Sequence, residues 1–192
     1  MSFIDNAYTD EIFKDLSLPR ENISNKEFSN CKFENCDFTE SNFSGTVFID
    51  CVFSNCNLST IKVDSCSFQD MQFEKCKLVG VFFSNINTFL LGWSFKKCRI
   101  ELCNFSGLDM KNSKFIDCEV RETEFLNSNL TGSEFVDSDL KASLFQNSNL
   151  EKVNFVGAKN YYIDPTQNKI KKAKFSQPEV LALLAKFDIE LL

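Results

Sequence analysis

The side chains with the greatest chemical potential in this chain are its nine cysteines, which could bind a soft metal or form a redox pair. The chain has no histidine, which excludes mechanisms that need an imidazole, such as a Ser-His-Asp triad or a His-ligated zinc. Neighbouring cysteines, such as Cys31 and Cys36, lie five residues apart, without the two-residue gaps of zinc ribbons or thioredoxin-like sites. We therefore interpret the cysteines as buried, reduced, structural thiols and expect no metal and no cofactor.

Carboxylates are the other abundant group, with 27 Asp and Glu against 21 Lys and Arg and a net charge of −6. This balance disfavours a general nucleic-acid binder, because phosphate affinity rests on Lys and Arg. No glycine-rich phosphate loop or nucleophile elbow accompanies the acids, so we expect no enzymatic activity. The acids concentrate around the single Arg121, as Asp117, Glu119, Glu122, Glu124, Glu134, Asp137 and Asp139.

A period of five residues determines where these side chains lie. A large apolar residue recurs at every fifth position from Ile23 to Phe83 and again, after a shift of two residues, from Phe95 to Phe155, which makes 26 positions. A second special position, two residues before each apolar one, holds every cysteine of the chain and elsewhere mostly Ser or Thr. This second position therefore selects a small side chain rather than a reactive one.

A five-residue period matches neither the 3.6-residue helix nor the two-residue strand. It requires a chain that turns after each short extended segment and winds in one sense, so that each coil buries its rings by stacking on the next. The pattern resembles the pentapeptide-repeat family, with matches at 36–40, 133–137 and 138–142. The resemblance implies an all-β solenoid, a right-handed quadrilateral β-helix with four pentapeptides per coil and both special positions pointing inward.

Four pentapeptides per coil place residues 20 apart above one another. After the shift, phenylalanines then occupy two opposite faces and smaller aliphatic residues the other two, which fills a narrow square core. The ladders on the opposite faces are Phe95, Phe115, Phe135 and Phe155, and Phe105, Phe125 and Phe145. At about 4.8 Å per coil, roughly six and a half coils form a rod about 30 Å long.

The same indexing gathers the acids on two adjacent faces across two stacked coils. Asp117, Glu134 and Asp137 share one face, and Glu119, Glu122 and Asp139 share the next. These six residues form a candidate acidic patch for a protein partner. A solvated face without a partner is the alternative.

We expect three regions: residues 1–20 as an N-terminal cap or first irregular coil, 21–159 as the repeat solenoid with a register break at 84–94, and 160–192 as a C-terminal segment. An open solenoid needs capped ends. Residues 176–179 have the form of a capping box, which predicts that a short α-helix closes the C-terminal end. Its expected apolar stripe, Val180, Leu183, Leu184, Phe187 and Ile189, continues into Leu191 and Leu192. This surface favours a homodimer interface over a monomeric cap, and the resemblance raises that expectation.

The register break contains the only tryptophan of the chain. The favoured interpretation is a bulge that buries Phe89 and Trp93 where two halves of the solenoid meet at a slight kink. A protruding loop that contacts a partner is the alternative.

In length, repeat content and phenylalanine-rich core the chain is similar to the quinolone-resistance (Qnr and MfpA) and microcin-immunity (McbG) types of the family. This resemblance implies a rod that mimics DNA, binds DNA gyrase or topoisomerase IV and protects it from quinolones or microcin. A structural adaptor for another protein is the alternative. Without a signal sequence or an apolar run long enough to span a membrane, we expect a cytoplasmic protein.

Overall fold

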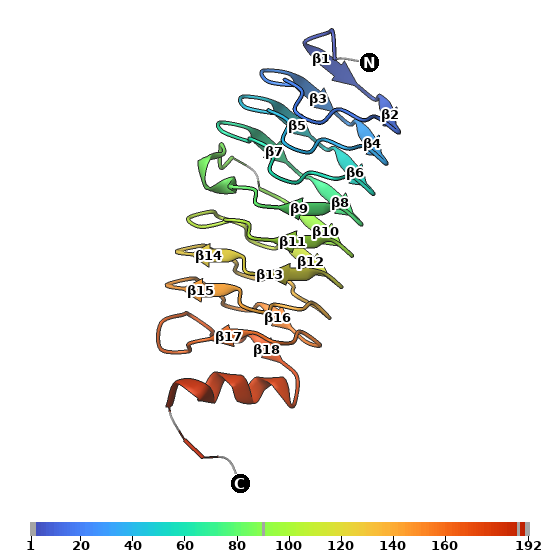
Figure 1. Ribbon diagram of the computed structural model, residues 1–192. Helices are drawn as coiled ribbons and strands as arrows, with labels where there is room; N and C mark the ends of the chain where they lie inside the picture. Colours follow the sequence, from blue (N-terminus) through green and yellow to red (C-terminus); the bar gives the residue numbers. More distant parts are fainter. Residues whose placement is uncertain (1–2, 90, 188, 191–192) are drawn as a thin grey trace.

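The computed structural model describes residues 3–89, 91–187 and 189–190. The chain winds into a right-handed β-solenoid, a rod with the first coil at one end and a short helix at the other (Figure 1). All strand pairs are parallel and join successive coils; for example, Tyr8 pairs with Phe28 and Phe28 with Phe48, each 20 residues on. This register confirms four pentapeptides per coil. None of the described helices has the length and apolarity needed to cross a membrane.

Four stacks of very short strands form the sides of the rod. The first side contains β1 (Ala7–Thr9), β3 (Glu27–Ser29), β5 (Val47–Ile49) and β7 (Ser67–Gln69). The second contains β2 (Ile12–Lys14), β4 (Lys32–Glu34), β6 (Val52–Ser54), β8 (Gln72–Glu74), β10 (Ser94–Lys96), β12 (Lys114–Ile116), β16 (Asn154–Phe155) and β18 (Lys174–Phe175). The third contains β9 (Lys77–Val79), β11 (Arg99–Glu101) and β13 (Glu119–Arg121), and the fourth contains β14 (Glu124–Leu126), β15 (Leu144–Gln146) and β17 (Tyr162–Ile163).

Most corners between two sides contain one residue with left-handed backbone. It lies two residues after the inward apolar residue, as at Asn30 (φ 52°) and Asn35 (φ 56°). Most corners carry Asn, Asp or Gly, which tolerate this conformation best. The side chain at a corner points outward, so the corner columns determine much of the surface charge.

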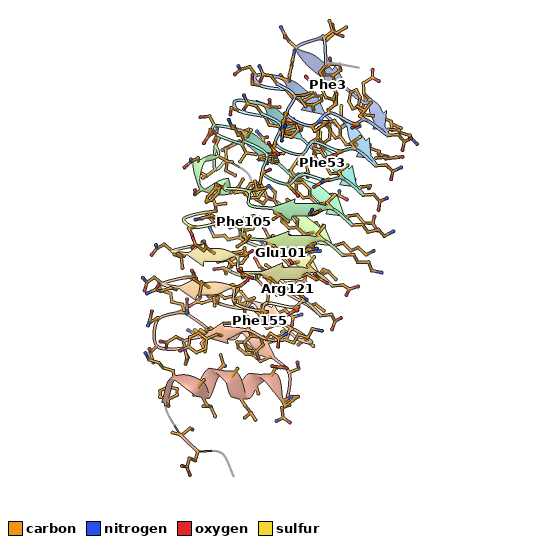
Figure 2. The ribbon with its side chains drawn as sticks, viewed as in Figure 1. Phe3, Phe53, Glu101, Phe105, Arg121 and Phe155 are labelled. Carbon is orange, nitrogen blue, oxygen red and sulfur yellow. The ribbon has the colours of Figure 1, made fainter. Side chains whose placement is uncertain are left out.

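The second side carries an unbroken column of nine phenylalanines along the rod. Adjacent rings are stacked within 19° of parallel, with centroids 4.5 to 5.6 Å apart. The column consists of Phe13, Phe33, Phe53, Phe73, Phe95, Phe115, Phe135, Phe155 and Phe175. Figure 2 shows Phe53 and Phe155 at two levels of this interior. The sequence-predicted ladder from Phe95 to Phe155 is therefore confirmed.

A second aromatic column changes side at the register break. In the first coils it follows the adjacent first side as Tyr8, Phe28, Phe48 and Phe68. In the later coils it follows the opposite fourth side as Phe83, Phe105, Phe125 and Phe145, which confirms the predicted opposite faces there. Trp93 lies between the two, with its ring centroid 5.9 Å from that of Phe68 and 5.2 Å from that of Phe83.

The break adds two residues to one coil, because Phe95 pairs with Phe73, 22 residues earlier. The coil also contains a 3-10 turn, η1 (Phe83–Asn85). Trp93 is 2% exposed, as expected, but the expected burial of Phe89 is wrong, since Phe89 is 62% exposed. Trp93 and Phe83 already occupy the interior at this level, which leaves no room for a further ring. Leu90 lies outside the described residues.

The C-terminal helix η2 (Glu179–Phe187) is a 3-10 helix rather than the expected α-helix. The Leu181 N–H donates to the Pro178 carbonyl, three residues earlier, at 3.0 Å. The expected capping box does not form with Ser176, whose hydroxyl accepts a hydrogen bond from the Gly157 N–H at 3.0 Å. With about three residues per turn, the apolar residues align differently from the α-helical expectation.

Candidate partner-binding surface

Five of the six acids of the candidate patch lie around one corner of the rod, across two coils, and Glu122 lies at the next corner. Asp117 and Asp137 stack at the corner between the second and third sides, with φ of 53° and 55°. Glu119 on β13 forms a bridge to Asp139, one coil further on. Glu134 occupies the second side and Glu122 the next corner.

Basic side chains lie within 4.0 Å of four of these six acids. Lys97 and Lys114 come from the preceding coil and approach Asp117 at 3.9 Å and Glu134 at 4.0 Å. Arg121 contacts Glu119 at 3.4 Å and Asp139 at 2.7 Å. Glu122 and Asp137 make no ion pair within the described part of the chain. Counting charges along the sequence missed Lys97 and Lys114, although their 20-residue distance from the acids was the available signal.

Asp139 is a structural part of this surface. Its carboxylate accepts hydrogen bonds from Asn160 at 2.7 Å and from Arg121 Nε at 2.9 Å, and its side chain is 10% exposed. Burial alone would raise the pKa of Asp139, but the hydrogen bonds from Asn160 and Arg121 outweigh it and hold the pKa below its ordinary value. An open groove of about 600 Å³ beside it has mixed charge and is lined by Arg99, Glu101, Arg121, Glu122, Asp139, Lys141 and Asn160. Figure 2 labels Glu101 and Arg121, which lie on neighbouring coils of the third side.

The small inward positions are defined by hydrogen bonding as well as by size. The Ser138 hydroxyl donates to the Phe115 carbonyl at 2.9 Å and accepts from the Cys118 N–H at 3.0 Å. Other Ser, Thr and Cys side chains donate to the equivalent carbonyl of the preceding coil in the same way. Trp93 occupies this position too, and its indole Nε1 donates to the Phe68 carbonyl at 2.9 Å. The sequence pattern indicated the size of these residues but not this bond.

Five of the cysteines form one column through consecutive coils. They are Cys36, Cys56, Cys76, Cys98 and Cys118, separated by 20 or 22 residues, so the column is not visible among cysteines five residues apart. Burial raises the pKa of Cys51, Cys66 and Cys103 to about 12, so these thiols stay protonated at neutral pH. Within the described residues, no three Cys, Asp or Glu side chains converge in an arrangement that could hold a metal ion.

The C-terminal end is fastened by polar residues that the sequence did not single out. Asp164 accepts hydrogen bonds from the Thr166 N–H at 2.8 Å and from Gln167 Nε2 at 3.0 Å, and pairs with Lys186 of η2 at 3.4 Å. The Thr166 hydroxyl and Lys186 lower the pKa of Asp164. Asn168 takes a small inward position and donates to the Phe145 carbonyl at 2.9 Å.

The expected dimer residues divide between two faces of η2. Leu183 packs against the end of the core with its neighbour Ala182, whereas Val180 and Leu184 are half-buried. Phe187 is 51% and Ile189 53% exposed. Leu181, at 49% exposed, adds to the outward face, because the 3-10 spacing aligns it with Leu184 and Phe187. Leu191 and Leu192 lie outside the described residues.

Comparison with solved structures shows the same fold in proteins of low sequence identity. The trypsin-treated structure of QnrB1, a plasmid-mediated fluoroquinolone resistance protein, matches with a TM-score of 0.80 and 16% identity over 97% of this chain and 98% of that chain. HetL, a pentapeptide-repeat protein involved in heterocyst differentiation regulation from the cyanobacterium Nostoc sp. strain PCC 7120, matches with a TM-score of 0.57 and 12% identity, over 88% of this chain and 87% of that chain.

No curated protein sequence matches the chain. The family model for the pentapeptide repeat region matches residues 26–89 and 86–155, and thus more than half of the sequence. These residues are the coils whose five-residue period, inward columns and left-handed corners are described above. The chain therefore belongs to the pentapeptide-repeat family.

Proposed function

We propose that this chain is a non-enzymatic binding protein whose partner is a type II topoisomerase, DNA gyrase or topoisomerase IV, and that it protects this enzyme from inhibitors such as quinolones or microcin. The observation that carries the proposal is the rod, which matches QnrB1 along nearly the full length of both chains. QnrB1 is described as a fluoroquinolone resistance protein. Nine buried free thiols favour a reducing compartment, so the proposal includes a cytoplasmic location.

The acidic surface of this rod would fit a partner whose groove is basic because it binds DNA. Duplex DNA carries a negative charge about every 1.7 Å of its axis, and a groove that binds it presents Lys and Arg. On this rod Glu122 and Asp137 project from left-handed corners and make no ion pair within the described residues. These two acids lack a basic neighbour, unlike Asp117, Glu119, Glu134 and Asp139, each of which lies within 4.0 Å of a Lys or Arg side chain.

A supercoiling assay with gyrase and a fluoroquinolone tests this function. Added protein should restore supercoiling, and the double variant Glu122→Lys/Asp137→Lys should lose this protection. The control is Asp10→Lys/Asp50→Lys, which makes the same charge change at two other exposed left-handed corners. Absence of protection by the wild-type protein, in the presence of either a quinolone or microcin, would contradict the proposal. Equal loss in both variants would contradict the placement of the site.

A second candidate function is that of an adaptor for a different protein. The match to HetL, whose described role is in the regulation of heterocyst differentiation, favours this candidate. Affinity capture with the wild-type chain and with Glu122→Lys/Asp137→Lys separates the two. Recovery of a protein other than a topoisomerase, bound equally by both forms, would support the adaptor role.

The proposal includes a homodimer joined through the C-terminal ends. The exposed side chains of Leu181, Phe187 and Ile189 lie on or beside the outward face of η2, and Tyr162 at 54% exposed adds to the apolar surface at this end. A two-fold axis at the end of the rod would bury this surface twice, once from each copy. Size measurement of the full chain at several concentrations tests this arrangement.

A further inference from the structure

One corner column of the rod carries two lysines directly followed by two aspartates. In the corner between the second and third sides, successive coils place Lys75, Lys97, Asp117 and Asp137. Hydrogen bonds between the coils fix this order: the N–H groups of Lys75, Lys97 and Asp117 donate to carbonyls of the following coil at 2.9, 3.0 and 3.0 Å. The four side chains therefore form one line parallel to the axis of the rod.

The four residues share one backbone conformation, which makes their side chains project in the same direction. Their φ angles are 53°, 54°, 53° and 55°. Successive coils are about 4.8 Å apart, so the two lysines, here called the basic levels, lie about 5 Å apart along the rod. The two aspartates, the acidic levels, are separated by the same distance. On the adjacent third side, Lys77, Arg99 and Glu119 follow one another in the same order. Arg99 pairs with Glu101 at 2.8 Å and Glu119 with Arg121 at 3.4 Å, so the corner column itself carries the uncompensated charge.

This order is poorly suited to pairing within one chain. Alternating charges would give each lysine an acidic neighbour on both sides, whereas here Lys75 lies against Lys97 and Asp117 against Asp137, and such like-charge neighbours repel. The one ion pair in the column, between Lys97 and Asp117, is long at 3.9 Å, and the two side chains are 54% and 60% exposed. Lys75 and Asp137 are exposed and make no ion pair within the described residues. The column thus retains most of its charge for an external partner.

We propose that this corner is a self-complementary interface through which two copies of the chain associate side by side in antiparallel orientation. A two-fold axis that crosses the corner between Lys97 and Asp117 places the two basic levels of one copy against the two acidic levels of the other. Lys97 then faces Asp117 of the second copy, and Lys75 faces Asp137. Such an axis generates each contact twice, which is the property of an isologous interface. A parallel arrangement would oppose like charges at every level.

This association does not depend on the proposed topoisomerase function, nor on contact through η2. It is electrostatic and exposed, so it weakens as salt screens the charges: the Debye length falls from about 30 Å at 0.01 M ionic strength to about 3 Å at 1 M. An apolar contact between the C-terminal ends does not weaken with salt in this way. When two copies pair at this corner, they cover Asp117 and Asp137, and so this pairing competes with any other partner of the acidic patch.

Sedimentation velocity of the full chain measures the association directly. We expect the mass of the wild-type protein to rise at least twofold between 500 mM and 20 mM NaCl. Lys75→Glu/Lys97→Glu makes the whole column acidic, and Asp117→Lys/Asp137→Lys makes it basic. Each variant alone should lack the low-salt species, whereas an equimolar mixture should regain it at 20 mM NaCl. Glu and Lys occupy left-handed corners elsewhere, at Glu40, Glu122, Lys152 and Lys172, so these substitutions fit the backbone.

The matched control is Lys152→Glu/Lys172→Glu, which applies the charge change of the acidic variant to two stacked lysines at another corner. This control should retain the salt-dependent association. The proposal is overturned if the mass of the wild-type protein is the same at both salt concentrations, if the mixture associates no more than each variant alone, or if the control loses association to the same extent. Mixing differently labelled samples of one variant measures the exchange of subunits through η2. Association in the equimolar mixture of the acidic and the basic variant must exceed that exchange.

Discussion

Replacing Ser138 with alanine tests whether the small inward positions need a hydrogen bond. Ser138 is fully buried, and its hydroxyl serves the Phe115 carbonyl and the Cys118 N–H. Alanine fits the space, and Ala158 already occupies the equivalent position one coil further on. The substitution nevertheless leaves two buried backbone groups without this partner. At about 1 to 2 kcal/mol for each, the free energy of unfolding should fall by about 2 to 4 kcal/mol.

The matched variant Ser138→Cys keeps a donor of similar size. In the preceding coils of this column, Cys76 and Cys98 donate to the Phe53 and Phe73 carbonyls at 3.2 and 3.3 Å. We therefore expect Ser138→Cys to lower the free energy of unfolding by less than about 1 kcal/mol, since a thiol is a weaker donor than a hydroxyl.

Urea unfolding measures both variants, with fluorescence of the single buried Trp93 and far-ultraviolet circular dichroism as two independent probes. The midpoint should shift without a change in the slope. If Ser138→Ala stays within about 0.5 kcal/mol of the wild type, or if cysteine is as damaging as alanine, the hydrogen bond of this side chain does not contribute to stability.

Thr60 is a β-branched residue at φ 54°, so Thr60→Asn should raise the free energy of unfolding by about 1 kcal/mol in the same urea assay; a lower midpoint would show that the corner is not strained there. The nine thiols are buried, and the pKa of Cys103 is raised to about 12, so a thiol reagent should modify none of them in the native protein and all nine after unfolding; rapid native labelling would contradict their inward placement. The pKa of Asp139 lies below its ordinary value of about 3.9, so its contribution to stability is complete above that pH and disappears as the pH falls through the folded-state pKa. Melting temperatures from pH 7 to pH 2 should show Asp139→Asn least stable relative to the wild type at neutral pH and nearly equal to it at the acidic limit, whereas a constant difference would exclude this linkage. If the C-terminal ends form the dimer, Phe187→Glu should halve the mass at high salt, whereas Phe82→Glu, at a site of similar exposure, should not; equal behaviour would place the interface elsewhere.

Most of the fold follows from residues close together in the sequence. A column such as Phe95, Phe115 and Phe135 needs only the five-residue period and the number of pentapeptides per coil, which the family resemblance supplied. Trp93 shows where this reasoning ends. It stands two residues before Phe95, where other coils have a small side chain, and the sequence predicted only that it is buried in a bulge. The structure accounts for the exception, because the second aromatic column changes side at this level and leaves room for the indole ring.

The candidate site was less predictable, because charge on a solenoid depends on neighbours one coil away. Asp117 and Glu134 were counted as free acids, whereas Lys97 and Lys114 lie over them at a separation of 20 residues. The conformation of the helix η2 was also not predictable from the sequence. Its apolar residues suit an α-helix or a 3-10 helix, and the choice between them redirects Leu181 outward.

The sequence by itself determined the short turning segments and their inward positions, since the same five-residue unit recurs and each unit can bury its ring only by stacking on the next. The tertiary structure decided which polar groups meet across coils: the hydrogen bond of each small inward side chain, the column of five cysteines, and the line of Lys75, Lys97, Asp117 and Asp137. The reason is geometric. Residues 20 to 25 apart become neighbours only when every corner between them has turned, and a two-residue insertion changes all the pairings that cross it.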